Sequence, residues 1–221
     1  MFKLTPVLKD YLWGGEKLKT MFGRKKDGIV AESWEFSVHR DGESRLADGG
    51  TFAGYLAEHP TATDPAGAGF PVLIKYIDAA QKLSVQVHPD DAYAGEKEHD
   101  NGKTEMWYVV DAEEGACLYH GFNREISKDE FAKRIEEDTL LEVLNKVPVH
   151  KGDVFFIEAG TIHAIGKGLI IAEIQQNSNV TYRVYDYGRV GKDGKKRELH
   201  IEKAVAVTNC APAKKDDSHY P

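Results

Sequence analysis

The stretch 83–91, LSVQVHPDD, begins with a strict alternation of hydrophobic and polar residues. In a β-strand, alternate side chains point to opposite faces, so its leucine and two valines would pack into a core. The polar residues Ser84, Gln86 and His88 would then line a pocket on the other face. Because metal ligands must converge, a period of two makes Gln86 and His88 candidate ligands on one wall.

A second stretch, 103–110, is rich in β-branched and aromatic residues and is predicted to form another strand. Its alternation places Lys103, Glu105 and Trp107 on one face. Glu105 would thus add a carboxylate to a polar wall. Taken singly, Glu105 is equally compatible with a solvated strand residue, and His88 with a surface histidine before a turn.

A third stretch, 152–163, is predicted to form a strand at 154–157, a tight Glu-Ala-Gly turn, and a following strand that begins near His163. Its spacing resembles the second signature of the cupin barrel, with Glu158 where proline is usual. In such a barrel, inward-facing residues of several strands meet at one mouth. We therefore expect a mainly β chain, a cupin or jelly-roll β-sandwich with a small helical insertion.

The candidate metal ligands are then Gln86, His88, Glu105 and His163. An amide oxygen, a carboxylate and two imidazoles form a mixed nitrogen and oxygen set, which suits one zinc ion with an open position for water or substrate. Mn²⁺, Fe²⁺ and Co²⁺ are also chemically acceptable, so the ligand types leave the metal open.

Several motifs together resemble the type I mannose-6-phosphate isomerases in their short bacterial form. They are YLWGG, QVHPDD, KTEMWY, AGTIHA and NSNVTYRVYDYGR, and the resemblance runs from about residue 5 to about residue 208. It implies a zinc-dependent aldose–ketose isomerase on a cupin-type sandwich, which interconverts mannose 6-phosphate and fructose 6-phosphate through an enediol. A small sugar phosphate is the expected partner.

The resemblance also implies roles for individual residues beyond the metal ligands. It places Arg183, Glu173 and Lys103 in catalysis, and Lys75, Ser84 and Trp13 in substrate binding. Within that group it implies that Lys75 and Ser84 contact the phosphate and that Trp13 lies near the sugar. We expect Glu173 to act as a base, because a carboxylate in a dry cleft gains basicity. We expect the permanently charged fork of Arg183 to stabilise oxyanion charge.

Each of these roles has a structural alternative. Arg183 could form an ion pair with Asp186, and Glu173 could face solvent. Trp13 could be an ordinary core aromatic. Lys75 lies in an apolar run, so it needs either a route to solvent or an anionic partner.

Two other functions remain open from the sequence. One is a different cupin metalloenzyme, such as an iron dioxygenase, and the other is a sugar-binding or sensing module without turnover. A glutamine ligand near an arginine and a glutamate favours the isomerase, since an oxygenase more often uses histidines or a facial triad.

Composition limits the expected partners and cellular location of the protein. A net charge of −7 argues against nucleic acid and an anionic membrane surface as partners. Cys117 and Cys210 suggest no disulfide framework and are expected to be reduced. The first residues contain no apolar signal stretch, and no run reaches transmembrane length, so a cytoplasmic location is expected. The oligomeric state is left open.

We expect residues 1–208 to form one metal-binding catalytic domain with a helical insertion at about 127–145, followed by a disordered polar tail at 209–221. The second β-sandwich half usual in the family is expected to be absent. Strands are predicted at about 32–38, 72–78, 83–88, 147–150, 154–157, 162–165, 169–174 and 180–185. Helices are predicted at about 51–58, 127–137, 139–144 and 200–207, and the segment 90–103 as a loop.

Overall fold

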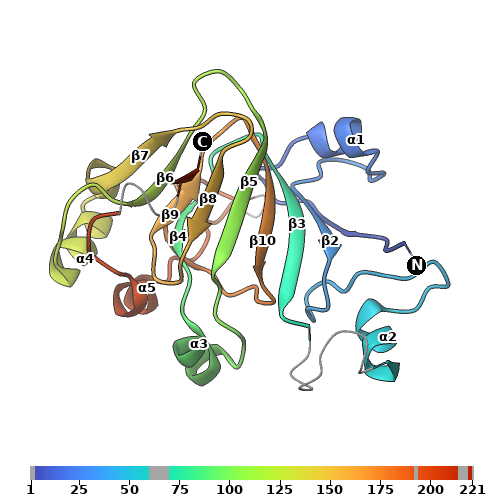
Figure 1. Ribbon diagram of the computed structural model, residues 1–221. Helices are drawn as coiled ribbons and strands as arrows, with labels where there is room; N and C mark the ends of the chain where they lie inside the picture. The colour runs from blue at the N-terminus through green and yellow to red at the C-terminus, as the bar shows by residue number, and fades with distance from the viewer. Residues whose placement is uncertain (1–2, 60–69, 192–193, 214–218, 221) are drawn as a thin grey trace.

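The computed structural model describes residues 3–59, 70–191, 194–213 and 219–220. Two antiparallel sheets face each other in it (Figure 1). The larger sheet has the order β1 (Val7–Lys9), β2 (Glu32–Phe36), β3 (Val72–Ala79), β10 (Leu169–Gln176), β5 (Glu105–Ala112), β8 (Val154–Ile157) and β12 (His219–Tyr220). The smaller sheet has the order β11 (Tyr182–Tyr185), β4 (Val85–Val87), β9 (His163–Ile165), β6 (Cys117–Phe122) and β7 (Leu144–Pro148).

A hydrophobic core fills the space between the sheets. Trp107 and Phe155 reach it from the larger sheet, and Leu118 and Ile165 reach it from the smaller one. The alternation of side chains along β5 explains which of its residues enter the core: Trp107 is fully buried, and the adjacent Tyr108 is 42% exposed. The predicted β-sandwich is confirmed, and the polar site lies toward one end of this core.

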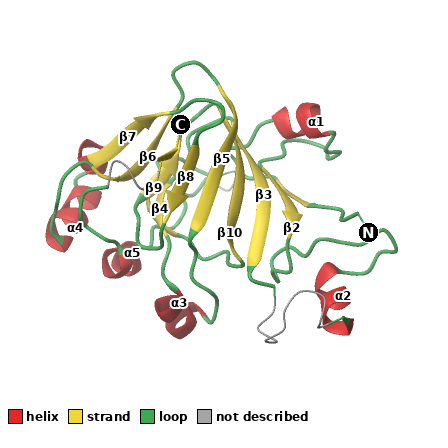
Figure 2. Cartoon of the chain, viewed as in Figure 1, coloured by secondary structure: helices red, strands yellow, loops and turns green. Residues whose placement is uncertain are grey.

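Helices cover the outer face of the smaller sheet (Figure 2). They are α4 (Lys128–Glu136), the short 3-10 helix Leu140–Val143, and α5 (Ile201–Val207). Val85 and Val87 of β4 pack into this layer with Phe131 and Ala204. The hydrophobic side of the 83–88 alternation therefore packs mainly under the helices, which frees the opposite side of β4 for the site.

Only the first of the two helices predicted in the insertion forms an α-helix. The Ser127 hydroxyl accepts a hydrogen bond from the main-chain N–H of Glu130 and starts α4 as predicted. Thr139 makes no such cap, and the chain forms one 3-10 turn before β7 begins at Leu144. The predicted helix at 139–144 is therefore confirmed in position but is a 3-10 helix, and it ends at Val143 because the next strand begins directly after it.

The segment 90–103 contains α3 (Asp91–Glu98), so the predicted loop is wrong in part. The Asp90 side chain caps this helix by accepting from the N–H of Tyr93, and Asp91 adds negative charge in the first turn. The predicted helix near 51–58 is confirmed as α2 (Phe52–Glu58), which Thr51 caps. A further helix, α1 (Lys17–Phe22), packs through Leu18 beside Ile170 of the larger sheet.

The expected disordered tail is only partly described, since residues 214–218 and 221 lie outside the described residues. Within the described part, the Asn209 N–H bonds to the Gly160 carbonyl, and the Ala213 N–H bonds to the Phe122 carbonyl. Residues 219–220 form β12 beside β8, which differs from the expectation for these two positions. None of the helices in the described ranges combines the length and apolar character needed to cross a bilayer.

Candidate metal centre and active site

Two rows of side chains, one on each sheet, form the walls of the site. In the smaller sheet, Arg183 of β11 is the cross-strand partner of Gln86 on β4, and Gln86 is the partner of His163 on β9. His88 lies two residues beyond Gln86, so the alternation of the strand directs it to the same side. Strand register thus gathers residues that are far apart in the sequence.

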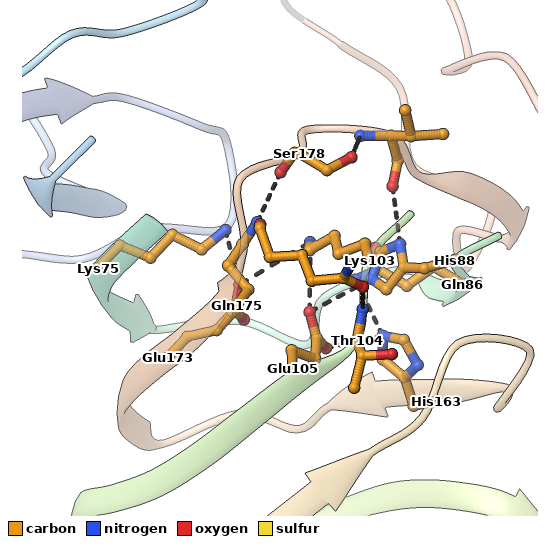
Figure 3. A network of polar contacts seen from close by, with 12 residues as sticks. Lys75, Gln86, His88, Lys103, Thr104, Glu105, His163, Glu173, Gln175 and Ser178 are labelled. Carbon is orange, nitrogen blue, oxygen red and sulfur yellow. Dashed lines mark hydrogen bonds and ion pairs between the residues drawn. The ribbon is translucent and has the colours of Figure 1, made fainter. Parts of the chain in front are cut away.

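The larger sheet supplies the charged row. Glu173 of β10 is the direct partner of Lys75 on β3 and of Trp107 on β5. Lys103 and Glu105 precede Trp107 by four and two residues, and all three are buried, as the predicted shared face requires. Figure 3 shows the charged side chains of this row beside the histidines of the smaller sheet.

The turn at 158–160 anchors the end of β8 to the metal candidates. Gly160 has a φ of 84°, a conformation that glycine adopts without a Cβ penalty. Its N–H donates to the carbonyl of His88 at 2.8 Å. The N–H of Ala159 donates to the hydroxyl of Thr104 at 3.2 Å. The Ala-Gly of the motif therefore holds the start of β9 against two segments that carry candidate ligands.

Three of the four predicted metal ligands converge directly. One ligand atom from each of His88, Glu105 and His163 lies within 4.8 Å of the others, and all three residues are buried. The Nε2 of His88 is 3.5 Å from one Glu105 oxygen, and the Nε2 of His163 is 3.3 Å from the other. The carboxylate thus lies between the two rings.

Main-chain carbonyls orient both imidazole rings. The Nδ1 of His88 lies 2.8 Å from the carbonyl oxygen of Val180, and the Nδ1 of His163 lies 2.8 Å from that of Thr161. A carbonyl only accepts, so each Nδ1 carries the proton and each Nε2 keeps a lone pair on the side of Glu105. This arrangement is characteristic of histidines that bind a metal.

The described residues leave the centre of this triad without hydrogen bonds. Neither the Nε2 of His88 nor either oxygen of Glu105 has a hydrogen-bond partner there, although all three atoms are buried. The cation beside them is the Nζ of Lys103, which forms an ion pair with one Glu105 oxygen at 3.3 Å. Buried polar groups without a hydrogen bond destabilise a fold by about 1–3 kcal/mol each, and more when charged. A divalent cation would satisfy all three at once, so the donor set fits a metal ion.

Gln86 lies at the edge of the triad, with its Nε2 3.3 Å from the Nε2 of His163. The amide presents its NH₂ group to the lone pair of the ring in this arrangement. Rotation of the amide by half a turn would present its oxygen instead, and the two arrangements differ only in hydrogen bonding. Gln86 is therefore placed to be a fourth ligand.

Burial determines the charge state of these groups in the metal-free protein. Desolvation lowers the pKa of His163 to about 3 and that of His88 well below its usual value, so both rings are neutral. Burial, and next the charge of Glu173, raise the pKa of Glu105 to about 7. Neutral imidazoles are ready to bind a metal, whereas Glu105 must first lose its proton.

Glu173 is buried rather than solvent-facing, but its basicity differs from the prediction. Burial alone would raise its pKa, yet Lys75 at 2.9 Å and Lys103 at 3.8 Å outweigh that effect and leave the pKa lowered. The indole N–H of Trp107 also donates to Glu173 at 2.9 Å. The expected gain in basicity is therefore wrong, and Glu173 is an ionised carboxylate.

Lys75 has the anionic partner that its apolar strand requires. Its Nζ lies 2.9 Å from Glu173 and 3.7 Å from Glu32, and only 5% of the residue is exposed. Desolvation disfavours its charge, but the two carboxylates raise the pKa of Lys75 overall. Of the two alternatives for Lys75, the structure therefore has the anionic partner: the charge of the ammonium is balanced by Glu173 and Glu32.

A cavity of about 270 Å³ opens above this polar floor. All six of the residues predicted for catalysis and substrate binding line it, together with Gln86. They are Trp13, Lys75, Ser84, Lys103, Glu173 and Arg183. Trp13 is also part of the hydrophobic core, so it is a core aromatic that reaches the cavity, and its role in substrate binding stays a prediction. The triad itself lies behind the lining, beside Gln86 and Lys103.

Arg183 does not form the ion pair with Asp186 that was its structural alternative. Its Nη1 donates to the main-chain carbonyl of Glu198 at 2.9 Å. The carboxylate of Asp186 instead binds the guanidinium groups of Arg189 and Arg197. The Arg183 side chain is therefore available to the cavity that it lines.

Some lining residues were not predicted from the sequence, notably Tyr11, Glu32, Asn179 and Arg197. Glu32 accepts a hydrogen bond from the indole of Trp34 at 2.6 Å, and strand alternation in ESWEF could have placed it on an inward face. Tyr11 lies 5.5 Å from Trp13 between ring centroids. The basic stretch 191–197 is typical of a solvated loop and less often of a phosphate-binding loop, so it did not single out Arg197.

Known proteins with similar sequences share one description. A family profile for the catalytic domain of type I phosphomannose isomerase matches residues 1–122. A probable mannose-6-phosphate isomerase of Bacillus subtilis is 44% identical over 216 residues, covering 92% of this chain and 67% of that protein. A mannose-6-phosphate isomerase of Streptococcus mutans is 42% identical over 203 residues, covering 89% of this chain and 64% of that protein.

A solved structure agrees with these relatives. The crystal structure of the mannose 6-phosphate isomerase from Bacillus subtilis matches with a TM-score of 0.90 and 37% identity, covering 97% of this chain and 71% of that one. The chain spans about two thirds of the length of the curated relatives that it matches.

Proposed function

The chain belongs to the type I phosphomannose isomerase family, and from that premise we propose that it interconverts mannose 6-phosphate and fructose 6-phosphate. One observation carries the proposal: a buried His88–Glu105–His163 triad, with ring nitrogens turned toward a carboxylate, lies beside a cavity lined by Lys103, Glu173 and Arg183. A metal site next to acid–base groups suits proton transfer beside a carbonyl. The small sugar phosphate is the proposed partner.

We propose one zinc ion per chain, held by His88, Glu105 and His163 with Gln86 as the fourth ligand. Two neutral imidazoles, a carboxylate and an amide oxygen are within the ligand chemistry of zinc. When bound, the ion supplies Lewis-acid stabilisation of the negative charge that develops on the sugar oxygens. Manganese, iron and cobalt remain alternatives that the same ligands accept.

Isomerisation moves a proton between C1 and C2 through an enediol, which requires a base in its deprotonated form. Glu173 is held as a carboxylate by Lys75 and Lys103, so it is ready to accept the carbon proton. Lys103, whose Nζ is 3.3 Å from Glu105, lies between the base and the metal candidates. It can hold a substrate oxygen or transfer a proton at that oxygen.

Arg183 is proposed to stabilise oxyanion charge on the substrate. Its guanidinium lines the cavity on the same wall as Gln86, its cross-strand partner, and its charge persists throughout the physiological pH range. Trp13 and Ser84 line the same cavity and are proposed to position the sugar. The ion pairs of Lys75 favour a role in holding Glu173, in place of the phosphate contact first expected.

The direct test is an assay of mannose 6-phosphate turnover before chelation, after chelation, and after zinc is restored. We expect activity to disappear with chelator and to return with zinc. Arg183→Ala should fold and hold metal but lose turnover, with exposed Lys146→Ala as the control variant. Turnover that persists in fully metal-free protein would contradict the proposal. Metal-loaded protein that binds sugar phosphate without turnover would favour a binding module.

The cytoplasmic location remains a prediction. Fractionation of cells that express the protein would test it.

A further inference from the structure

The two candidate metal-binding histidines are oriented by carbonyls of different origin. His163 uses the carbonyl of Thr161, two residues before it in the tight turn, where the Thr161 N–H donates to the carbonyl of Glu158 at 3.0 Å. His88 uses the carbonyl of Val180, which lies 92 residues further along the chain. The orientation of His163 is therefore set locally, whereas that of His88 depends on how a distant segment is held.

That distant segment is the connection 177–181 between β10 and β11. Its residues lie outside both strands, so sheet pairing does not fix its backbone. It opens the motif NSNVTYRVYDYGR, and its residues 177–179 have no part in the proposed chemistry. Val180 holds the ring of His88, while Asn179 and Thr181 line the cavity. A displacement of this connection would thus disturb the candidate ligand and the cavity wall together.

The buried hydroxyl of Ser178 ties the connection 177–181 to a second part of the site. It accepts a hydrogen bond from the Val180 N–H at 3.2 Å and donates one to the main-chain carbonyl of Asn101 at 2.7 Å. Ser178 is only 1% exposed. Asn101 precedes Glu105, the first residue of β5, by four positions. One hydroxyl therefore joins the segment that orients His88 to the segment that leads into Glu105.

Gln175 holds the same connection from within the larger sheet. It is 2% exposed and is the cross-strand partner of Glu105. Its Nε2 donates to the main-chain carbonyls of Ser178 at 2.6 Å and of Gln176 at 2.9 Å. Both acceptors are carbonyls, so the nitrogen of the amide must face them. Figure 3 shows the path of hydrogen bonds from Gln175 through Ser178 to His88.

We propose that Ser178 is a positioning residue of the metal centre, and that Gln175 supports it by holding the connection 177–181. Together they keep the Val180 carbonyl where it directs the Nε2 of His88 toward Glu105. The proposal rests on the proposed function and assigns a task to a part of the motif that contacts no reacting group. A ring that is free to turn presents its lone pair to an ion less often, so partners behind a metal-binding histidine commonly change metal affinity by about tenfold to a hundredfold.

The experiment measures metal affinity without turnover. Zinc is titrated into the metal-free full chain in competition with a chromophoric chelator. Ser178→Ala removes the hydroxyl that bridges Val180 and Asn101, and should raise the Kd for zinc by about tenfold to a hundredfold. Cobalt(II) is the second probe, because its visible absorption reports the geometry of its ligands. The cobalt spectrum of Ser178→Ala should differ from that of the wild type.

Ser44→Ala is the matched control variant. Ser44 is also completely buried, and its hydroxyl accepts from the Ser37 N–H at 3.0 Å and donates to the main-chain carbonyl of Glu35 at 3.3 Å. It makes the same kind of bridge as Ser178, but within the segment 35–44. Ser44→Ala should lower the free energy of unfolding about as much as Ser178→Ala does. It should leave the zinc Kd and the cobalt spectrum as they are in the wild type.

Gln175→Met keeps the test decisive if Ser178→Ala fails to fold. Methionine has a similar length but cannot donate, so the connection 177–181 loses its support while the packing is largely kept. The Oε1 of Gln175 is buried without a hydrogen-bond partner among the described residues, so the variant loses no bond at that atom. The Kd for zinc should rise by about tenfold.

The outcomes separate this proposal from the proposed function. A wild-type zinc Kd and cobalt spectrum in both Ser178→Ala and Gln175→Met overturn the positioning role, even if the wild type is an active isomerase. Equal weakening in Ser178→Ala and Ser44→Ala also overturns it, because the loss then comes from a general loosening of the fold. Weakening confined to Ser178→Ala and Gln175→Met supports the role. It does so even if the zinc-loaded wild type leaves mannose 6-phosphate unchanged, a result that rejects the isomerase alone.

Discussion

Glu173 and Lys75 are direct cross-strand partners on β10 and β3, with 2.9 Å between a carboxylate oxygen and the ammonium nitrogen. Both residues are almost completely buried, at 3% and 5% exposure. A buried carboxylate would ordinarily take up a proton, but the lysine keeps its charge stable. This pair links the fold of the larger sheet to the chemistry of the site.

Lys75→Met should destabilise the protein by about 3–5 kcal/mol, because it leaves buried carboxylates without their cation. The free energy of unfolding in urea measures this. Lys146→Met removes an exposed lysine from β7 and should change stability by less than about 0.5 kcal/mol. Equal effects from the two substitutions would show that the buried pair does not stabilise the fold.

Trp107→Phe should lower kcat by about tenfold or more while leaving KM close to its original value. The substitution removes the indole N–H that holds Glu173 at 2.9 Å, and a hydrogen bond to a charged group contributes about 1.5–3 kcal/mol. Steady-state kinetics with mannose 6-phosphate measures both constants. Tyr108→Phe, at an exposed position on the same strand, is the control and should retain full activity. A wild-type kcat in Trp107→Phe would remove the positioning role.

Zinc at about a hundred times its Kd should stabilise the folded protein by about 2.7 kcal/mol, since the triad exists only in the native state. Chemical unfolding with and without zinc measures the difference. His163→Ala should abolish the gain, whereas His150→Ala, whose side chain is 82% exposed, should keep it. A gain that survives in His163→Ala would place the metal elsewhere.

Metal binding should release a proton at pH 6 and release little at pH 8. Burial raises the pKa of Glu105 to about 7, so the metal-free protein holds that proton at pH 6 and has largely lost it at pH 8. The pKa of His163 is already lowered to about 3, so the ring has no proton to give in this range. Metal affinity should therefore rise with pH up to about 7 and then level off.

Calorimetric titration of zinc in buffers of different ionisation enthalpy counts the released proton. Glu158→Gln changes an exposed carboxylate beside the site and should release the same number of protons as the wild type. Proton release that is equal at pH 6 and pH 8 would contradict a raised pKa at Glu105.

Local sequence patterns predicted the parts of the site that depend on strand periodicity. Alternation placed Gln86 with His88, and Lys103 with Glu105, on inward faces because side chains in a strand repeat every two residues. The tight turn before His163 was predicted from the spacing of its motif, and Gly160 adopts a positive φ in it. These features are set by residues within a few positions of one another.

Two features were predicted less well, one of them local and the other dependent on a distant segment. The helix at Asp91–Glu98 was missed, although Asp90 is a good cap, because charged residues suggested a loop. The basicity of Glu173 was predicted in the wrong direction, since Lys75 lies almost a hundred residues earlier in the chain. The sequence suggested that Glu173 is buried, but it did not show that lysines lie beside the carboxylate.

Strand periodicity and turn chemistry act over a few residues, so the linear pattern of residues was enough to predict a β-sandwich and its inward-facing side chains. The family was indicated by the resemblance of several motifs. Which inward groups meet was settled by how the strands pair and the sheets pack. The register of β3 against β10 pairs Lys75 with Glu173, and the approach of the two sheets brings Glu105 to the histidines. The return of the chain after β11 sets Arg197 on the cavity. Electrostatic interactions depend on distances through space, and those distances exist only once the sheets have paired and packed.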